Sequence, residues 1–181
     1  EEREMLLKEL HHRVKNNLQT ITGMLWIQNK KNLSKEGSEL FNDILQRIKS
    51  ISLVHELLYA SDSISKIPTK LYFEQLIDSM RVGMSGKDMS ILKNIEEVDL
   101  GIEETIILGT IAVEAITNSI KHAFPSVKTP TIYVHLLKNG NNCALIIKDN
   151  GVGFDEENAK HNGLGLKIIE KTAAKLRDVK I

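Results

Sequence analysis

Cysteine is almost absent from this sequence, which has only Cys143 among its 181 residues. A lone cysteine excludes an internal disulfide and fits a reducing compartment. Its neighbours Ala144–Ile147 are apolar, so we interpret Cys143 as a structural residue of a strand. An excess of charge of either sign is absent too, because 24 Lys and Arg balance 24 Asp and Glu. This balance provides no general attraction to nucleic acid or to an anionic membrane, and we expect no nucleic-acid partner.

Long hydrophobic runs are also absent. No apolar stretch approaches the roughly 20 residues needed to cross a bilayer, and no signal peptide is visible. The chain starts at Glu1 without an initiator methionine. We therefore expect a cytoplasmic piece of a longer protein, with any membrane contact made by segments outside this sequence. Hydrophobic residues make up 41% of the chain and charged residues 27%, so the chain can bury a core.

Two amphipathic helices are predicted in the N-terminal third. Apolar side chains recur at steps of three and four over residues 5–28 and again from about Ser38 to Tyr59. The two series are Leu7, Leu10, Val14, Leu18, Ile21 and Leu25, then Phe41, Ile44, Ile48, Ile51, His55 and Leu58. A polar, turn-like segment joins them at 29–37. Because one partner helix cannot cover either stripe alone, we predict a homodimer that forms a four-helix bundle.

The composition changes after the second helix. Residues 61–65, followed by Pro68, are typical of a linker, and we divide the chain into a helical unit, 1–66, and an α/β unit, 67–181. The second unit is predicted to contain helices at 71–84, 103–123 and 164–177, and strands at 90–98, 131–138 and 143–148. Asn139-Gly140-Asn141-Asn142 between the last two strands is a strong hairpin signal. We expect an α/β sandwich with helices on one face of its sheet.

Two glycine motifs lie where predicted elements end or begin. Asp149-Asn150-Gly151-Val152-Gly153 directly follows a strand, where a carboxylate can accept from an exocyclic adenine amine and glycines let the backbone approach a ligand. Asn162-Gly163-Leu164-Gly165 opens the last helix, whose free N–H groups and positive dipole end suit a polyphosphate. Taken alone, either motif is also typical of a plain turn or helix start.

A third motif lies on the helix predicted at 103–123. Glu114, Asn118 and His122 are spaced four residues apart and share one face, with Lys121 beside them. Such a polar stripe is often only the solvated side of a half-buried helix. It also offers what a Mg-triphosphate site requires, a hard amide oxygen for Mg²⁺ and cations for the phosphates.

In their order along the chain, the three motifs resemble the N, G1 and G2 boxes of the GHKL ATPase superfamily. The resemblance implies ATP and Mg²⁺ as cofactors, with Asn118 as metal ligand and Asp149 as adenine reader. It also implies that residues 155–162 form a short lid hinged at Gly163 and Gly165. The full implied binding set is Asn118, Lys121, His122, Asp149, Gly151, Gly153, Gly163, Leu164 and Gly165.

The first helix resembles the phosphoacceptor box of HWE-like histidine kinases. The stretch His11-His12-Arg13-Val14-Lys15-Asn16 carries this likeness, and residues 47–59 resemble the second dimerisation helix of the same subgroup. At about 100° per residue, His11 falls near the edge of the apolar stripe, while His12 lies nearly opposite it, beside Glu9 and Asn16. We therefore predict His12 as the outward acceptor. The resemblance implies an ATP-dependent protein histidine kinase that passes the phosphoryl group to the receiver domain of a response regulator.

The sequence departs from its relatives at three points. Arg13 stands where many histidine kinases have an acidic residue, so Glu9 is the candidate base, and Asn16 and Glu114 complete the predicted catalytic set with His12. The proline that commonly precedes Leu-Gly in this type is missing before Leu108-Gly109, which we expect to alter only the start of the helix. The terminal hairpin and third glycine box of the GHKL fold are absent from this sequence, so we expect part of the sheet and one phosphate contact to be missing.

Two alternatives remain open at this point. A GHKL ATP hydrolase would use Glu114 to polarise water and has no need of an acceptor helix at 5–28. A degenerate module would bind nucleotide weakly, dimerise and signal by conformation alone.

Overall fold

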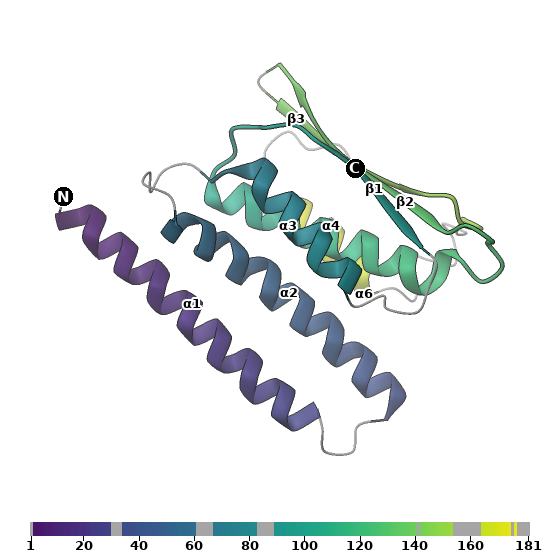
Figure 1. Ribbon diagram of the computed structural model, residues 1–181, viewed down its shortest axis with the longest axis horizontal. Helices are drawn as coiled ribbons and strands as arrows, with labels where there is room; N and C mark the ends of the chain where they lie inside the picture. Colours follow the sequence, from purple (N-terminus) through teal and green to yellow (C-terminus); the bar gives the residue numbers. More distant parts are fainter. Residues whose placement is uncertain are drawn as a thin grey trace.

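The N-terminal region is a hairpin of two long helices, as predicted. In the computed structural model, α1 spans Glu2–Asn29 and α2 spans Lys35–Ala60, and the two run antiparallel (Figure 1). Each is a few residues longer than its apolar pattern, because polar residues at helix ends continue the backbone hydrogen bonds without adding to the pattern. The predicted linker 61–65 lies outside the described residues. The structure describes residues 2–29, 34–60, 67–82, 89–140, 142–153, 164–174 and 176.

The rest of the described chain is a mixed α/β structure, which confirms the predicted fold class. Its elements are α3 (Thr69–Val82), β1 (Ser90–Ile95), α4 (Ile102–Asn118), η1 (Ser119–Ala123), β2 (Thr131–Asn139), β3 (Asn142–Asp149) and α6 (Leu164–Ala173). The strand order is β1-β2-β3, with β1 parallel to β2 and β2 antiparallel to β3. The predicted hairpin is present, with Asn139 opposite Asn142 and Gly140 at a φ of 61°. Glycine reaches that left-handed conformation without steric cost.

Three elements end earlier than predicted. The last helix, expected over 164–177, ends at Ala173. The strand expected to reach residue 98 stops at Ile95, because the next side chains bond to other segments. The Glu97 carboxylate accepts from the backbone N–H groups of Thr69 (3.0 Å) and Lys70 (3.3 Å) and so caps the start of α3. The helix expected over 103–123 changes after Asn118 into η1, a single π-helical turn. Single π turns inside α-helices are frequent at functional sites.

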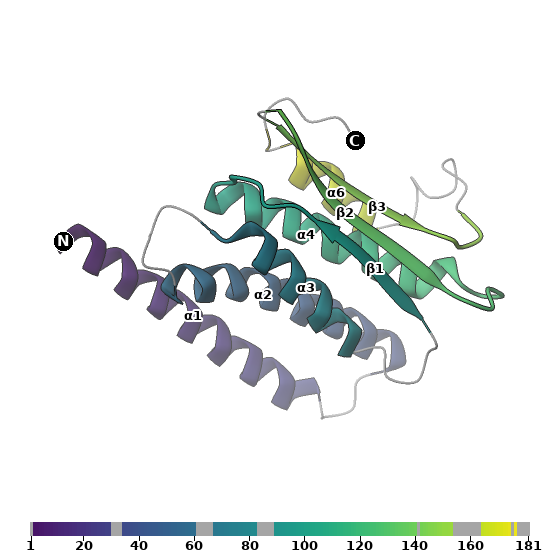
Figure 2. The same cartoon turned by 45° about the horizontal axis from the view of Figure 1, so that its top comes forward.

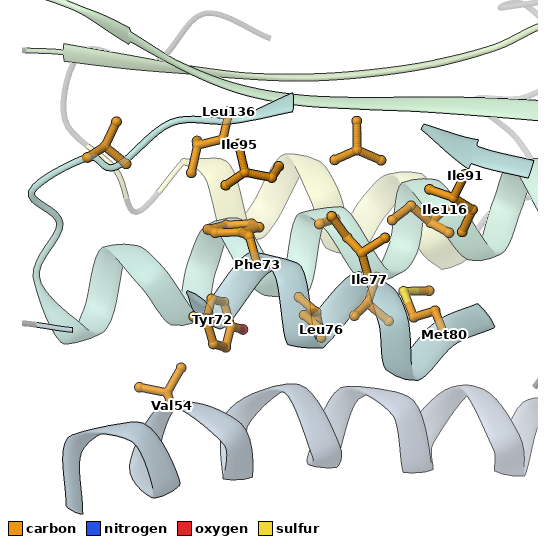
Figure 3. Packing of buried hydrophobic residues seen from close by; sticks show 14 of the residues in the cluster. Val54, Tyr72, Phe73, Leu76, Ile77, Met80, Ile91, Ile95, Ile116 and Leu136 are labelled. Atoms are coloured by element: carbon orange, nitrogen blue, oxygen red, sulfur yellow. The ribbon is translucent and has the colours of Figure 1, made fainter. Parts of the chain in front are cut away.

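The helices stack in layers on one face of the sheet. Figure 1 shows α3, α4 and α6 against the sheet, then α2, and α1 outermost; Figure 2 shows the same order after rotation. One hydrophobic cluster joins these layers, with Ile91 and Leu136 from the sheet and Phe73 and Ile77 from α3 (Figure 3). Val54 of α2 belongs to the same cluster, so the second hairpin helix is packed into the core of the α/β half.

A polar contact within this core ties three helices together. The buried Tyr72 hydroxyl on α3 donates to the backbone oxygen of Ser50 on α2 at 3.3 Å. A Cβ on Gly109 of α4 would lie only 1.9 Å from that hydroxyl oxygen, so only glycine leaves room for the Tyr72 ring. Burial raises the pKa of Tyr72, which therefore stays a neutral donor. Gly109 lies well inside α4, so its role is close packing against Tyr72.

Candidate functional site

The C-terminal end of β3 meets the C-terminal end of α4. Asp149 ends β3, and its Oδ2 accepts a hydrogen bond from the Ser119 hydroxyl at 2.7 Å. Its Oδ1 accepts from the backbone N–H of Gly151 at 3.0 Å. Asn118, the last residue of α4, immediately precedes Ser119 and is half-buried. The fold therefore brings the predicted metal ligand and the predicted adenine reader to one place, although 30 residues separate Ser119 from Asp149.

The turn after Asp149 is held by bonds from both sides. Asn150 accepts from the Thr131 N–H at 2.8 Å and donates to the Thr129 oxygen at 3.0 Å. A Cβ on Gly151 would lie 2.4 Å from the carbonyl oxygen of Ala123, so this glycine is required by a close approach to η1. Gly153 is required for a different reason, because its φ of 74° lies in the left-handed region.

The polar stripe of α4 is not simply a solvated face. Glu114 is only 4% exposed, and its carboxylate forms an ion pair with Arg47 of α2. Lys121 in η1 forms a second ion pair with Asp43 of α2, at 2.6 Å. The interpretation of the stripe as the solvated side of the helix is therefore wrong for Glu114. Among the predicted residues of this motif, His122 is exposed. Arg47 and Asp43 had no sequence signal, because their partners lie 67 and 78 residues away.

The predicted acceptor region lies on α1. His12 is half-buried, and its Nδ1 lies 3.2 Å from the side-chain amide nitrogen of Asn16, one turn later. Glu9 forms an exposed ion pair with Arg13 at 2.7 Å, so the candidate base carries a cation beside it. The side chain of His11 lies outside the described residues, and its predicted position at the rim of the stripe stays a prediction.

His12 and the β3 site lie at opposite ends of α2. Lys15, close to His12, bonds to Glu56 at 3.0 Å, whereas Lys121 bonds to Asp43 near the start of α2. Asp43 and Glu56 are 13 residues apart, which at 1.5 Å per residue is about 20 Å along the helix. Helix α2 also lies between α1 and the α/β half (Figures 1 and 2). Within this arrangement the acceptor imidazole does not meet the β3 site.

The second glycine motif is described only in part. Helix α6 begins at Leu164, as predicted, includes Gly165 and packs beside α4. Gly163 and the proposed lid at 155–162 lie outside the described residues, so their roles stay predictions.

The described residues fit a metal ion that takes most of its ligands from waters and phosphates and few from the protein. No group of three or more His, Cys, Asp or Glu in the described part of the chain could hold a metal ion by itself. The Asn118 amide offers one hard oxygen, which suits Mg²⁺ because this ion usually keeps waters and substrate phosphates as its other ligands. Among the helices that the structure describes, none combines the length and apolar character needed to cross a bilayer.

Comparison with known families gives two matches that together span most of the chain. A histidine kinase family model matches residues 9–82. A second model, of the histidine kinase-, DNA gyrase B-, and HSP90-like ATPases, matches residues 103–181. The first match covers the hairpin from residue 9 onward together with α3, and the second covers α4 from residue 103 onward together with the β3 site.

Individual relatives and structures agree with these matches. Sensor histidine kinase PdtaS of Mycobacterium tuberculosis is 26% identical over 179 residues, which is 90% of this chain and 33% of PdtaS. Blue-light-activated histidine kinase 2 of Erythrobacter litoralis is 24% identical over 174 residues, 91% of this chain and 49% of that protein. The chain thus spans about a third of PdtaS. The histidine kinase domain of Erythrobacter litoralis EL346 has the same fold, with a TM-score of 0.68 over 96% of this chain and 84% of that domain at 17% identity.

Proposed function

We propose that this chain, which belongs to the histidine kinase family, uses ATP to phosphorylate its own His12 and passes the phosphoryl group to an aspartate of a response regulator. One observation carries the nucleotide half of this proposal. The Asp149 carboxylate at the end of β3 is bonded to Ser119, directly after Asn118, so the adenine-reading and metal-binding residues form one site. The ATPase family match over residues 103–181 supports ATP as the ligand of that site.

Different residues of the site bind the adenine, the metal and the phosphates of ATP. Asp149 accepts from the adenine amine, while Gly151 and Gly153 shape the turn beside the base. Asn118 holds Mg²⁺, which when bound neutralises charge on the phosphates. Lys121 and His122 of η1 supply further hydrogen-bond donors for the phosphates, for which Lys121 exchanges its contact with Asp43. Gly163, Leu164 and Gly165 bind the phosphates at the start of α6.

The acceptor chemistry falls to one ring nitrogen of His12. A neutral imidazole is a competent nucleophile near neutral pH. The Asn16 side-chain amide nitrogen lies 3.2 Å from Nδ1, and because an amide N–H only donates, this contact favours the tautomer in which Nδ1 accepts and the ring proton is on Nε2. Attack through Nε2 therefore requires that a base remove this proton, and the N–P bond to the γ-phosphorus forms as the P–O bond to the leaving ADP breaks. Glu9, one turn before His12, is the nearest acidic candidate to take the ring proton.

Phosphoryl transfer requires a change from the arrangement described above. The β3 site is about 20 Å along α2 from the part of α1 that carries His12. Either the ATP-binding half leaves this position on α2, or it serves the His12 of a second chain. Chains carrying His12→Ala mixed with chains carrying Asp149→Asn distinguish the two routes, because label appears on the Asp149→Asn chain only if transfer occurs between chains.

A homodimer fits the exposed surface of the hairpin. Among the α1 side chains that the structure describes, six large apolar ones are at least 45% exposed: Met5, Leu6, Leu10, Ile21, Met24 and Ile27. At about 100° per residue, Leu6, Leu10, Ile21 and Met24 fall on a face that His12 does not share. A second hairpin on that face would cover this apolar surface and keep His12 accessible. We place the chain in the cytoplasm, with residues 1–66 as the dimerisation and phosphotransfer unit and 67–181 as the ATP-binding unit.

Incubation with γ-labelled ATP tests the activity. The label should be acid-labile and alkali-stable, as expected of a phosphohistidine, and His12→Ala should abolish it while ATP affinity stays within about twofold. His11→Ala should keep the label. Phosphate release without labelled protein would instead support an ATP hydrolase, a reading that the Arg47 partner of Glu114 disfavours because the carboxylate is engaged. Label lost in His11→Ala but kept in His12→Ala would overturn the choice of acceptor.

A further inference from the structure

Ser119 holds the carboxylate of Asp149 from a buried position. Ser119 is 8% exposed, and its hydroxyl donates to Asp149 Oδ2 at 2.7 Å, within the range of charge-assisted O–H···O⁻ bonds. The Gly151 N–H donates to the other oxygen at 3.0 Å. Both oxygens of the exposed Asp149 carboxylate therefore accept hydrogen bonds from the protein. The plane of the carboxylate is set before a ligand arrives.

The π-helical turn places Ser119 where it can do this. Ser119 begins η1 and Ala123 ends it. The Ala123 oxygen accepts from the Val152 N–H at 2.9 Å, and Gly151 lies directly against Ala123. One turn of helix thus contacts the Asp149 turn at both of its ends. The change from α- to π-helix after Asn118 directs Ser119 and Ala123 toward the same turn, which links the metal-binding end of α4 to the base-binding end of β3.

From this geometry we infer that Ser119 is the positioning residue that makes Asp149 selective for a 6-amino purine. The inference rests on the proposed function, in which Asp149 reads adenine. Adenine presents an exocyclic N–H donor, which an oriented carboxylate accepts. Guanine presents a carbonyl oxygen at the same position, and two acceptors facing one another repel. Without the Ser119 hydroxyl, the carboxylate is held on one oxygen only and can turn about its Cβ–Cγ bond, so acceptance of adenine weakens and rejection of guanine is relaxed.

Nucleotide affinities of the whole chain test this inference. The dissociation constants of ATP and GTP are measured by titration calorimetry with Mg²⁺ for the parent and for Ser119→Ala, Ser119→Thr and Thr117→Ala. Ser119→Ala should lose about tenfold in ATP affinity, as for a lost hydrogen bond to a charged group. Its GTP affinity should not fall, so the ATP-to-GTP preference drops by the same factor. Ser119→Thr keeps the hydroxyl and should keep the ATP-to-GTP preference of the parent. Thr117→Ala removes a hydroxyl two residues earlier and should leave it unchanged.

The outcomes separate this inference from the function beneath it. If Asp149→Asn loses ATP affinity while Ser119→Ala keeps the full preference for ATP, Asp149 reads adenine without Ser119 and the inference is wrong. If Asp149→Asn binds ATP like the parent, the adenine assignment itself fails, and this inference fails with it. A loss of ATP and GTP affinity by equal factors in Ser119→Ala would indicate a structural role and would also overturn the inference. Should Ser119→Ala not fold, Ser119→Cys supplies the same comparison with a much weaker donor.

Discussion

Removal of the Arg47 side-chain charge should destabilise the folded chain strongly. The Glu114 side chain is 6% exposed and the Arg47 side chain 22% exposed, so the pair is largely withdrawn from water. Arg47→Met keeps most of the aliphatic stem but leaves the Glu114 carboxylate buried without its cation. A movement of α2 that exposed this carboxylate to water would also expose Val54 on the same helix, which is fully buried in the core.

The magnitude follows from which groups remain buried. Breaking a buried ion pair by removing one partner costs about 3–5 kcal/mol, whereas replacing both partners by apolar residues of similar size is often nearly neutral. Arg47→Met should therefore lower the free energy of unfolding by about 3 kcal/mol or more. The double variant Arg47→Met with Glu114→Met should recover most of the loss. Urea unfolding followed by circular dichroism gives each value from the midpoint and the slope.

The second ion pair between the same elements supplies the matched control. The Asp43 and Lys121 side chains are 22% and 29% exposed, so the carboxylate of this pair is more accessible to solvent than that of Glu114, at 6%. Asp43→Asn should cost no more than about 1 kcal/mol, the usual range for accessible pairs. If Arg47→Met costs as little as Asp43→Asn, or if the double variant is no better than Arg47→Met alone, the carboxylate is not held in a buried, cation-dependent environment and the reasoning fails.

Three further predictions concern the nucleotide site, the core and the dimer. Asp149→Asn should weaken ATP binding by about 1–3 kcal/mol with or without metal, since a charge-assisted bond is lost. Asn118→Ala should chiefly change the Mg²⁺ dependence of labelling. Calorimetry at several Mg²⁺ concentrations distinguishes the two effects. Gly109→Ala should lower the free energy of unfolding by about 1–3 kcal/mol or more, because the new methyl overlaps the Tyr72 hydroxyl, and an unchanged urea midpoint would contradict this. Leu10→Glu should dissociate the dimer without unfolding the chain, because Leu10 is 54% exposed; light scattering that finds the parent itself monomeric at micromolar concentration would refute the dimer.

The sequence by itself determined the local elements and the order of the motifs. The steps of three and four predicted both hairpin helices, because an amphipathic helix must repeat its apolar residues at that period. Asn139-Gly140 predicted the hairpin, because the turn needs a residue that accepts positive φ. The carboxylate and glycines after β3, and the polar stripe that includes Asn118, could be found because their spacing is short. Their agreement with a known family then pointed to ATP.

Only the tertiary structure decided what these residues touch. Periodicity predicted one apolar stripe on α2, yet the buried residues Leu45, Val54 and Leu57 of this helix lie outside that stripe. Val54 and Leu57 belong to the core cluster of the α/β half, and a local pattern does not state which second surface a helix meets. The sequence left open whether the polar stripe on α4 is a solvated face, and the ion pair of Glu114 with Arg47 excludes this for Glu114. Ser119 has no local sequence signal, because its hydrogen bond to Asp149 depends on where η1 packs. The two polar contacts join residues 67 and 30 positions apart, so they depend on how whole elements pack, which the spacing of residues within one element does not record.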